Sequence, residues 1–348
     1  MGMHNLRAKI KSVLGYMIYH SGLFSTWLNR LNKDRFLVLM YHRIVPAGKA
    51  GPYLQPGMYV EPETFDLHLH FLKQHFDIRT VEELCDPAAK EQRKNLRRIA
   101  CYLTFDDGWS DFYHYAFPLL VKHHVPVTVY LPTGFIGTSK TFWTDRLGGI
   151  LTMVNHKKCF AEFREYVRTE LALENHGLSS TPEQFFEEII YELKKLREER
   201  ISALLVALEY RYAVPTSAIK HDFLTWNQVE EMHRSGLVTY GSHTVNHHIL
   251  TTLKAEEIHK ELHYSKQCLN NKGLIKNDKV SFCYPNGNYN DDVMRVLLSE
   301  KYTCAFTTLN GWNKQDNHFF ELKRVGLHQD ISSNKHLLAY NIYRSNRT

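Results

Sequence analysis

The sequence predicts an α/β fold in which parallel strands alternate with helices. Short apolar runs of strand type recur along the chain, and segments with helical spacing lie between them. The segment 99–131 is a run, a helix and a second run, which is the βαβ step of a parallel sheet. Polar motifs follow directly after several of these runs. The expected strands are 36–42, 99–103, 127–131, 237–240, 280–284, 304–307 and 322–328.

The N-terminal segment, residues 1–35, predicts a basic amphipathic helix over residues 5–30. It carries six Lys or Arg residues and one acid, Asp34. Its uncharged run at 13–19 is too short for a bilayer span of about 20 residues, and no small-residue cleavage site follows, so we expect no secretory signal. Two interpretations stay open: an interfacial helix on an anionic membrane, or a helix docked on the main domain. The apolar face consists of Leu6, Ile10, Val13, Leu14 and Met17.

Residues 36–348 predict one large α/β domain with an addition. A helix over 111–124 is expected to bend or restart at Pro118, because proline lacks the N–H that continues a helix. Residues 146–220 interrupt the alternation of strands and helices. Thr181-Pro182-Glu183 is a typical helix start, so we interpret about 146–220 as a helical insertion, which could be a lid or a partner surface.

Composition points to an ordinary globular protein of 348 residues with 43% hydrophobic residues. The net charge of +6 is mild, and no nucleic-acid motif is present, so no nucleic-acid partner is expected. The six cysteines form no CxxC pair. Cys101, Cys283 and Cys304 lie in apolar runs and are expected to be buried free thiols. Nothing in this usage demands an oxidising compartment, and we expect a cytoplasmic location, with the inner face of the membrane as the peripheral alternative.

Two adjacent carboxylates, Asp106 and Asp107, follow the second predicted strand and precede Gly108. Side-by-side carboxylates repel each other unless a cation lies between them or one keeps its proton. A solvated turn is the plain alternative, since Asp-Asp-Gly is common in turns.

A histidine pair, His243 and His247, follows another predicted strand. A spacing of four residues lets one helical turn or a tight loop point both imidazoles the same way. One Asp and two His form a three-ligand set that leaves a coordination position open, as in catalytic zinc sites. Zinc is the expected ion, with cobalt, manganese or nickel as alternatives.

A third motif, Tyr284-Pro285-Asn286-Gly287, ends the strand that begins near residue 280. With TFDDG at 104–108 and HTVNH at 243–247, in this order, the chain from 36 to 330 resembles the polysaccharide deacetylase family with its NodB-homology domain. The resemblance implies a distorted (β/α) barrel and metal-dependent removal of N-acetyl groups from sugars.

The resemblance also implies site roles. Asp107, His243 and His247 would hold the metal, and Asp106 would be the general base. An oxyanion would be stabilised near Tyr284, Pro285 and Asn286, where Asn286 replaces the usual Tyr of the family. The Tyr-His pair that ends the first strand would place His42 beside the substrate cleft, unless that histidine only satisfies a buried hydrogen bond.

The chain departs from the family pattern at two places. Many members carry an arginine shortly before the proline, which pairs with the base, whereas this chain has Phe282-Cys283-Tyr284. Arg324 on the last predicted strand is the candidate replacement. His328 is the candidate for the late histidine that acts as catalytic acid, although its surrounding motif matches poorly. For each of these two residues, a surface role is the alternative.

Three hypotheses follow. The first is a metal-dependent N-deacetylase that acts on an amino sugar of a polysaccharide or glycan precursor. The second is a related hydrolase of another non-peptide C–N bond. The third is a non-catalytic carbohydrate-binding barrel, and the intact Asp106 counts against it, because a binding protein needs no base.

Overall fold

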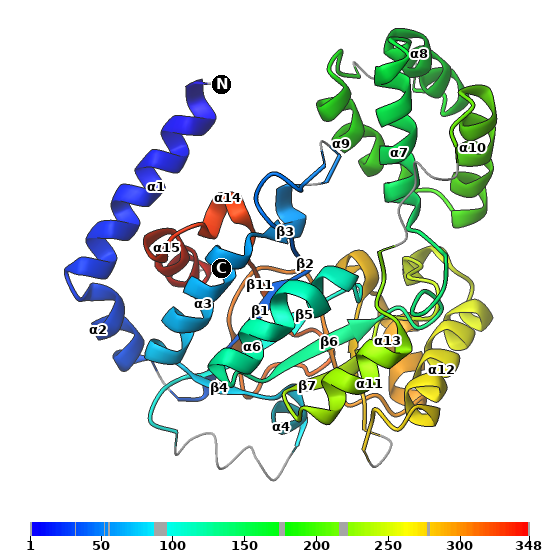
Figure 1. The fold of residues 1–348 in the computed structure, drawn as a ribbon. Helices are drawn as coiled ribbons and strands as arrows, with labels where there is room; N and C mark the ends of the chain where they lie inside the picture. Colours follow the sequence, from blue (N-terminus) through cyan, green and yellow to red (C-terminus); the bar gives the residue numbers. More distant parts are fainter. Residues whose placement is uncertain are drawn as a thin grey trace. The chain divides into compact units, whose positions relative to one another are not determined.

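The structure is a computed structural model that describes residues 2–31, 33–51, 53–54, 56–86, 96–173, 178–215, 222–276 and 279–346. The chain forms two compact units (Figure 1). The first comprises Met1–Lys49, Pro56–Gly137 and Phe223–Thr348, and the second comprises Ala50–Gln55 and Thr138–Asp222.

A curled parallel sheet forms the centre of the first unit. Six strands lie side by side in the order β1 (Arg35–Tyr41), β5 (Ala100–Phe105), β6 (Val127–Leu131), β7 (Val238–Ser242), β8 (Ser281–Cys283) and β9 (Cys304–Phe306). The short strands β4 (Asp77–Arg79) and β11 (Val325–Gly326) pair in parallel with β5 and β1, and β10 (Asn313–Lys314) pairs antiparallel with β1. The predicted α/β fold of the distorted (β/α) barrel type is confirmed, with the curled sheet forming a half-barrel.

The two edges of the sheet are joined near the C-terminal end of the chain. Leu322 forms a parallel bridge with Phe306 of β9, and three residues later β11 begins and pairs with β1. The predicted strand over 322–328 is therefore shorter in the structure, because its first part bonds to one edge and its second part to the other.

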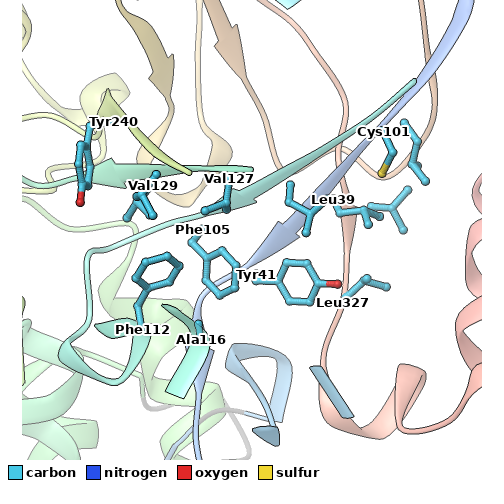
Figure 2. Close-up of a cluster of buried hydrophobic side chains, with 14 of the residues drawn as sticks. Leu39, Tyr41, Cys101, Phe105, Phe112, Ala116, Val127, Val129, Tyr240 and Leu327 are labelled. Atoms are coloured by element: carbon cyan, nitrogen blue, oxygen red, sulfur yellow. The ribbon is translucent and has the colours of Figure 1, made fainter. Parts of the chain in front are cut away.

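Side chains alternate between the two faces of the sheet, as the period of two in a strand requires. Leu39 and Tyr41 of β1 point toward the helices, where Tyr41 stacks on Phe105 at 5.0 Å between ring centroids and Phe105 meets Phe112 at 4.8 Å (Figure 2). The opposite set contains Val38 and forms a smaller buried cluster on the other face. This second face becomes important for the site.

The helices of the first unit follow the sheet strands in the alternation that the sequence predicts. The segment 111–124 contains a π-helical turn, η2 (Phe112–Ala116), before α6 (Phe117–His123), so the helix restarts one residue before Pro118. The other helices are α3 (Pro62–His75), α4 (Val81–Cys85), α11 (Trp226–Arg234), α12 (Ala255–Asn271), α13 (Asp291–Ser299), α14 (Gln329–Ser332) and α15 (Lys335–Ser345). Short elements are β2 (Arg43–Ile44), β3 (Tyr59–Val60), η1 (Pro56–Met58), η4 (Leu250–Thr252) and η5 (Pro285–Gly287).

The N-terminal segment forms two helices, α1 (Gly2–His20) and α2 (Leu23–Arg30). The single helix predicted over 5–30 is wrong, because Gly22 takes a left-handed φ of 75° between them. Helix α1 docks on α15 so closely that a Cβ on Gly15 would lie 2.2 Å from the carbonyl oxygen of His336. The side chain of Leu6 lies outside the described side chains. Ile10, Val13, Leu14 and Met17 are exposed.

The cysteines differ from the expectation at one position. Cys304 forms a disulfide with Cys85 across 219 residues, so the predicted free thiol at Cys304 is wrong. Cys101 and Cys283 are buried and free.

The second unit is helical and has its own core. It contains α7 (Trp143–His156), α8 (Phe160–Glu170), α9 (Pro182–Leu193) and α10 (Glu198–Arg211). Phe163, Phe185 and Leu205 are among its fully buried residues. The expected insertion at 146–220 lies within this unit. Across the described parts of both units, no helix has the length and apolar character that a membrane span requires.

Candidate metal and catalytic site

The turn that follows β5 directs the side chains of the two adjacent aspartates to different partners. Asp107 and Gly108 both have left-handed φ values, 76° and 67°, which glycine adopts readily and aspartate tolerates. A Cβ on Gly108 would lie 2.9 Å from Leu131 and Ile136 side-chain atoms, so the turn also needs glycine for space. Asp106 projects from the same face of the sheet as Tyr102 and Thr104, which is the face that carries Val38 and is called the inner face below. Asp107 points to the two histidines.

The histidine pair lies in a tight loop after β7. Thr244 and His247 have positive φ values, 68° and 58°, so the loop is not helical. Glu261 of α12 is buried and accepts hydrogen bonds from the backbone N–H groups of Val245 at 2.9 Å and Asn246 at 2.8 Å. This carboxylate therefore fixes the loop that carries His247.

Asp107, His243 and His247 converge on one point. Oδ1 of Asp107 lies 3.4 Å from Nε2 of His243 and 3.2 Å from Nε2 of His247. Ligands of a tetrahedral zinc ion stand roughly 3.4 Å apart when metal–ligand distances are about 2.0–2.2 Å. The spacing of the three ligand atoms therefore fits a zinc-sized cation without a change of fold.

Further contacts orient these three ligands. Nδ1 of His243 lies 2.7 Å from the carbonyl oxygen of Cys283, which can only accept, so Nδ1 carries the proton and Nε2 offers its lone pair. Nε1 of Trp109 donates to the second oxygen of Asp107 at 3.1 Å. Burial opposes ionisation of Asp107, but the contacts with the two imidazoles outweigh it and hold the pKa of this carboxyl well below its usual range.

Asp106 forms a buried ion pair with Arg324. The guanidinium donates to both carboxylate oxygens, at 2.8 and 2.7 Å, and to the carbonyl oxygen of Thr307 at 2.9 Å. Burial alone would raise the pKa of Asp106, but the charge and hydrogen bonds of Arg324 lower it. Asp106 is therefore an ionised carboxylate at neutral pH, in the form that accepts a proton.

Cys283 is a neighbour of this pair that the sequence did not single out as a site residue. Its sulfur lies 3.3 Å from Oδ2 of Asp106 and 2.9 Å from the guanidinium of Arg324. Burial raises the pKa of its thiol, so it is a neutral neighbour of the ion pair. Its place in Phe282-Cys283-Tyr284, where the family pattern has an arginine, was the available signal.

His42 lies beside the same carboxylate, with Nε2 3.9 Å from Oδ2 of Asp106. Burial lowers its pKa although both aspartates act to raise it, so the imidazole is neutral at neutral pH. The structure thus brings His42 to the ends of β1 and β5, next to Asp106.

The YPNG segment meets the expectation only in part. The ring of Tyr284 is buried and its hydroxyl donates to the carbonyl oxygen of Phe320 at 2.9 Å, so its side chain belongs to the core and is not placed to touch a substrate. Pro285 is buried, whereas Asn286 is exposed and has a left-handed φ of 57°. A Cβ on Gly287 would lie 2.0 Å from the hydroxyl of Thr308, which explains the glycine.

His328 is the residue before α14, where its side chain makes no capping hydrogen bond, and it follows β11 at the end of the sheet where β1 leads to His42. Its Nδ1 contacts a carboxylate oxygen of Asp330 at 2.9 Å, and its side chain is 23% exposed. This contact orients the ring and leaves it accessible from solvent.

Solved structures share this fold. The Streptococcus pyogenes deacetylase PplD, solved in complex with acetate, superposes with a TM-score of 0.56 at 19% identity over 89% of this chain and 97% of its own. IcaB from Ammonifex degensii gives a TM-score of 0.53 at 18% identity over 88% of this chain and 97% of its own. At these identities the likeness concerns the fold, an α/β half-barrel of the deacetylase type.

The family follows from the sequence comparison. A family model described as polysaccharide deacetylase matches residues 93–305, which is more than half of the chain. The chain therefore belongs to the polysaccharide deacetylase family, and the resemblance seen in the motifs is confirmed. The curated Bacillus subtilis (strain 168) protein named "Putative polysaccharide deacetylase YxkH" is 20% identical over 309 residues, which cover 88% of this chain and 77% of that protein.

Proposed function

We propose that this protein is a metal-dependent hydrolase that removes N-acetyl groups from an amino sugar of a polysaccharide or glycan precursor. The observation that carries the proposal is the convergence of Asp107, His243 and His247 beside the ionised pair of Asp106 and Arg324. Membership of the polysaccharide deacetylase family supports hydrolysis of a C–N bond in a glycan. The acetate complex of the related fold PplD agrees with an N-acetyl substrate.

The residues divide the chemistry between them. Asp107, His243 and His247 would hold a divalent cation, with zinc preferred because two of three ligands are imidazoles. When bound, such a cation polarises an amide carbonyl and makes a water more acidic. Asp106 accepts the proton of the attacking water, and Arg324 keeps its carboxylate ionised. We assign the proton for the leaving amine to His328 and the oxyanion contact to the backbone N–H of Asn286.

The N-terminal helix is proposed as a peripheral membrane contact. Its exposed apolar residues lie opposite the face that docks on α15, and an amphipathic helix with basic residues binds anionic lipid surfaces. The cytoplasmic location, with the inner membrane face as the alternative, remains a prediction. The Cys85–Cys304 disulfide removes one of its grounds, since disulfides persist mainly in oxidising compartments.

The test uses the two adjacent aspartates. Asp107→Asn removes an anionic ligand, so bound metal and acetate release should both fall, and excess metal should restore part of the rate. Asp106→Asn leaves the three ligands in place, so metal should stay bound while acetate release collapses, because an amide cannot accept the proton of the attacking water. Bound metal is measured by elemental analysis and acetate by an enzymatic assay on an N-acetylated amino-sugar oligomer. Retained activity in Asp106→Asn would exclude the mechanism, and equal metal loss in both variants would exclude the ligand assignment.

A further inference from the structure

A second cluster of metal-ligand side chains lies on the surface of the first unit. His259 and His263 stand one turn apart on α12, and Glu300 follows α13 as its C-cap. The three side chains offer ligand atoms that all lie within 4.8 Å of one another. None of them takes part in the site described above.

The geometry is that of a preformed chelate. Nε2 of His259 lies 2.8 Å from one oxygen of Glu300, and Nδ1 of His263 lies 3.0 Å from the other. The two imidazole rings are stacked, with 8° between their planes and 5.5 Å between centroids. Tetrahedral ligands stand roughly 3.4 Å apart, so outward movement of about half an ångström from these distances would admit an ion between the rings and the carboxylate.

The carboxylate side of the cluster is anchored to the protein, and the histidine side is open to solvent. The ammonium of Lys266, a mostly buried residue of α12, donates to the backbone carbonyl oxygen of Glu300 at 2.7 Å, which ties the end of α13 to α12. The side chains of His259 and His263 are 54% and 44% exposed, against 15% for Glu300. A partly buried carboxylate therefore lies beneath two more exposed imidazoles.

Nearby charges do not exclude a cation. Lys260, which lies between the two histidines in sequence, pairs with Glu256 at 2.7 Å. Lys266 directs its charge at a backbone carbonyl. The carboxylate of Glu300 supplies the negative charge of the cluster.

We propose that His259, His263 and Glu300 form a second metal site, which binds a divalent transition-metal ion of the zinc, copper or nickel class. Imidazole nitrogens select these ions over magnesium and calcium, which prefer oxygen ligands. Three protein ligands leave further positions to water or an external donor. The ion would join α12 to the end of α13, and α12 also carries Glu261, which holds the loop of His247.

The experiment isolates this site from the first one. Zinc is titrated calorimetrically into the full chain carrying Asp107→Asn and His247→Ala, which removes two of the three ligands of the first site. This background should still bind one zinc ion per chain. Adding His259→Ala should weaken that binding at least about tenfold, because one of three ligands is lost. Adding Glu300→Gln, which keeps the volume and a hydrogen-bond acceptor, should weaken it as well.

Controls separate the site from general effects. His70→Ala removes an exposed histidine of α3 and should leave the titration unchanged. Zinc should raise the melting temperature of the background chain, since an ion that binds only the folded state stabilises it, and this rise should vanish with His259→Ala. In the otherwise unchanged chain, His259→Ala should remove one equivalent of bound metal and leave acetate release unaltered.

Two results would overturn the proposal. One is a background chain that binds no zinc at concentrations up to about 1 mM. The other is binding that persists unchanged in His259→Ala and Glu300→Gln. Both results are independent of the deacetylase proposal, which depends on the metal content and acetate release of the Asp106 and Asp107 variants.

Discussion

Arg324 donates to both oxygens of Asp106, although 218 residues separate them in the chain. The register explains how they meet. Leu39 of β1 is paired with Val325 on one side and with Leu103 on the other. Arg324, one residue before Val325, is therefore level with Tyr102 of β5. Its side chain extends along the inner face of the sheet to Asp106 at the end of β5. The guanidinium is fully buried, so its charge acts on Asp106 without screening by solvent.

Removing this charge should shift the pH dependence of the reaction. In Arg324→Met, the strongest of the influences that oppose burial is lost, so the pKa of Asp106 rises. The base is lost as pH falls through that pKa, so the acid limb of kcat/KM should move to higher pH. Arg324→Lys keeps the charge with fewer directed donors and should shift the limb less. Coincident pH profiles for all three proteins would show that Arg324 does not control the base.

The same pair should contribute to stability with a defined sign. The pKa of Asp106 is lowered in the folded protein, so its contribution is present above the ordinary carboxyl pKa of about 3.9 and is lost as pH falls through the folded value. Removing one partner of a buried ion pair costs about 3–5 kcal/mol. Urea unfolding at neutral pH should show a loss of this order for Arg324→Met. A loss no larger than that of an exposed substitution would contradict the burial of the pair.

Glu261 should control metal affinity without touching the metal. Its carboxylate accepts two backbone N–H groups and the side-chain amide of Asn246, and Glu261→Gln replaces one acceptor oxygen with a donor that faces them. We expect affinity to fall by about 10–100-fold, as for other groups that orient ligands, with kcat near normal at saturating metal. Chelator competition measures the affinity. Glu256→Gln, an exposed change on the same helix, is the matched control and should change nothing.

His328→Ala tests the proposed proton donor. Loss of a general acid should lower kcat by about 10²–10⁴-fold while bound metal stays constant. His318→Ala removes an exposed histidine elsewhere in the first unit and should have no such effect. A near-normal kcat in His328→Ala would show that His328 is not the proton donor. His42 would then be the next histidine to test, because its Nε2 lies 3.9 Å from Oδ2 of Asp106.

The membrane contact is best tested by surface substitutions. Deleting residues 1–30 would also remove Phe24 and Leu28, which are buried in the core. Ile10→Ser, Val13→Ser and Met17→Ser together remove exposed apolar surface from α1 and should reduce binding to anionic vesicles in a sedimentation assay. Val206→Ser, at an exposed apolar residue of α10, is the control. Vesicle binding that does not respond to the triple change would leave α1 as a docked helix only.

The sequence could predict the parts of the site that lie in local motifs. Asp107, His243 and His247 each follow a parallel strand, and the carboxyl ends of such strands meet at one rim. Arg324 could be predicted because Phe282-Cys283-Tyr284 has no arginine immediately before Pro285, where many family members carry one. For Asp107, His243 and His247 the residue types and their places after predicted strands sufficed, whereas Arg324 became a candidate through the family pattern.

The remaining features depend on packing that no local pattern encodes. Cys283 neighbours Asp106 because both side chains project from the same face of the sheet. Glu261 serves the His247 loop because of where α12 docks. Cys85 meets Cys304 across 219 residues. The single helix predicted over 5–30 was wrong because its helical spacing of apolar residues does not reveal that Gly22 takes a left-handed conformation, which ends α1.

The pairing of β1 with β11 can form only late in the synthesis of the chain. Arg324, the counter-ion of Asp106, is synthesised 218 residues after it. At about 5–20 residues per second, this delay lasts roughly 11–44 s. Until then the nascent chain has a carboxylate facing the sheet interior without the guanidinium that offsets its burial, and β1 lacks one neighbour. We therefore expect a chain that is arrested or truncated before residue 324 to remain catalytically silent, so that activity begins only when translation is nearly complete.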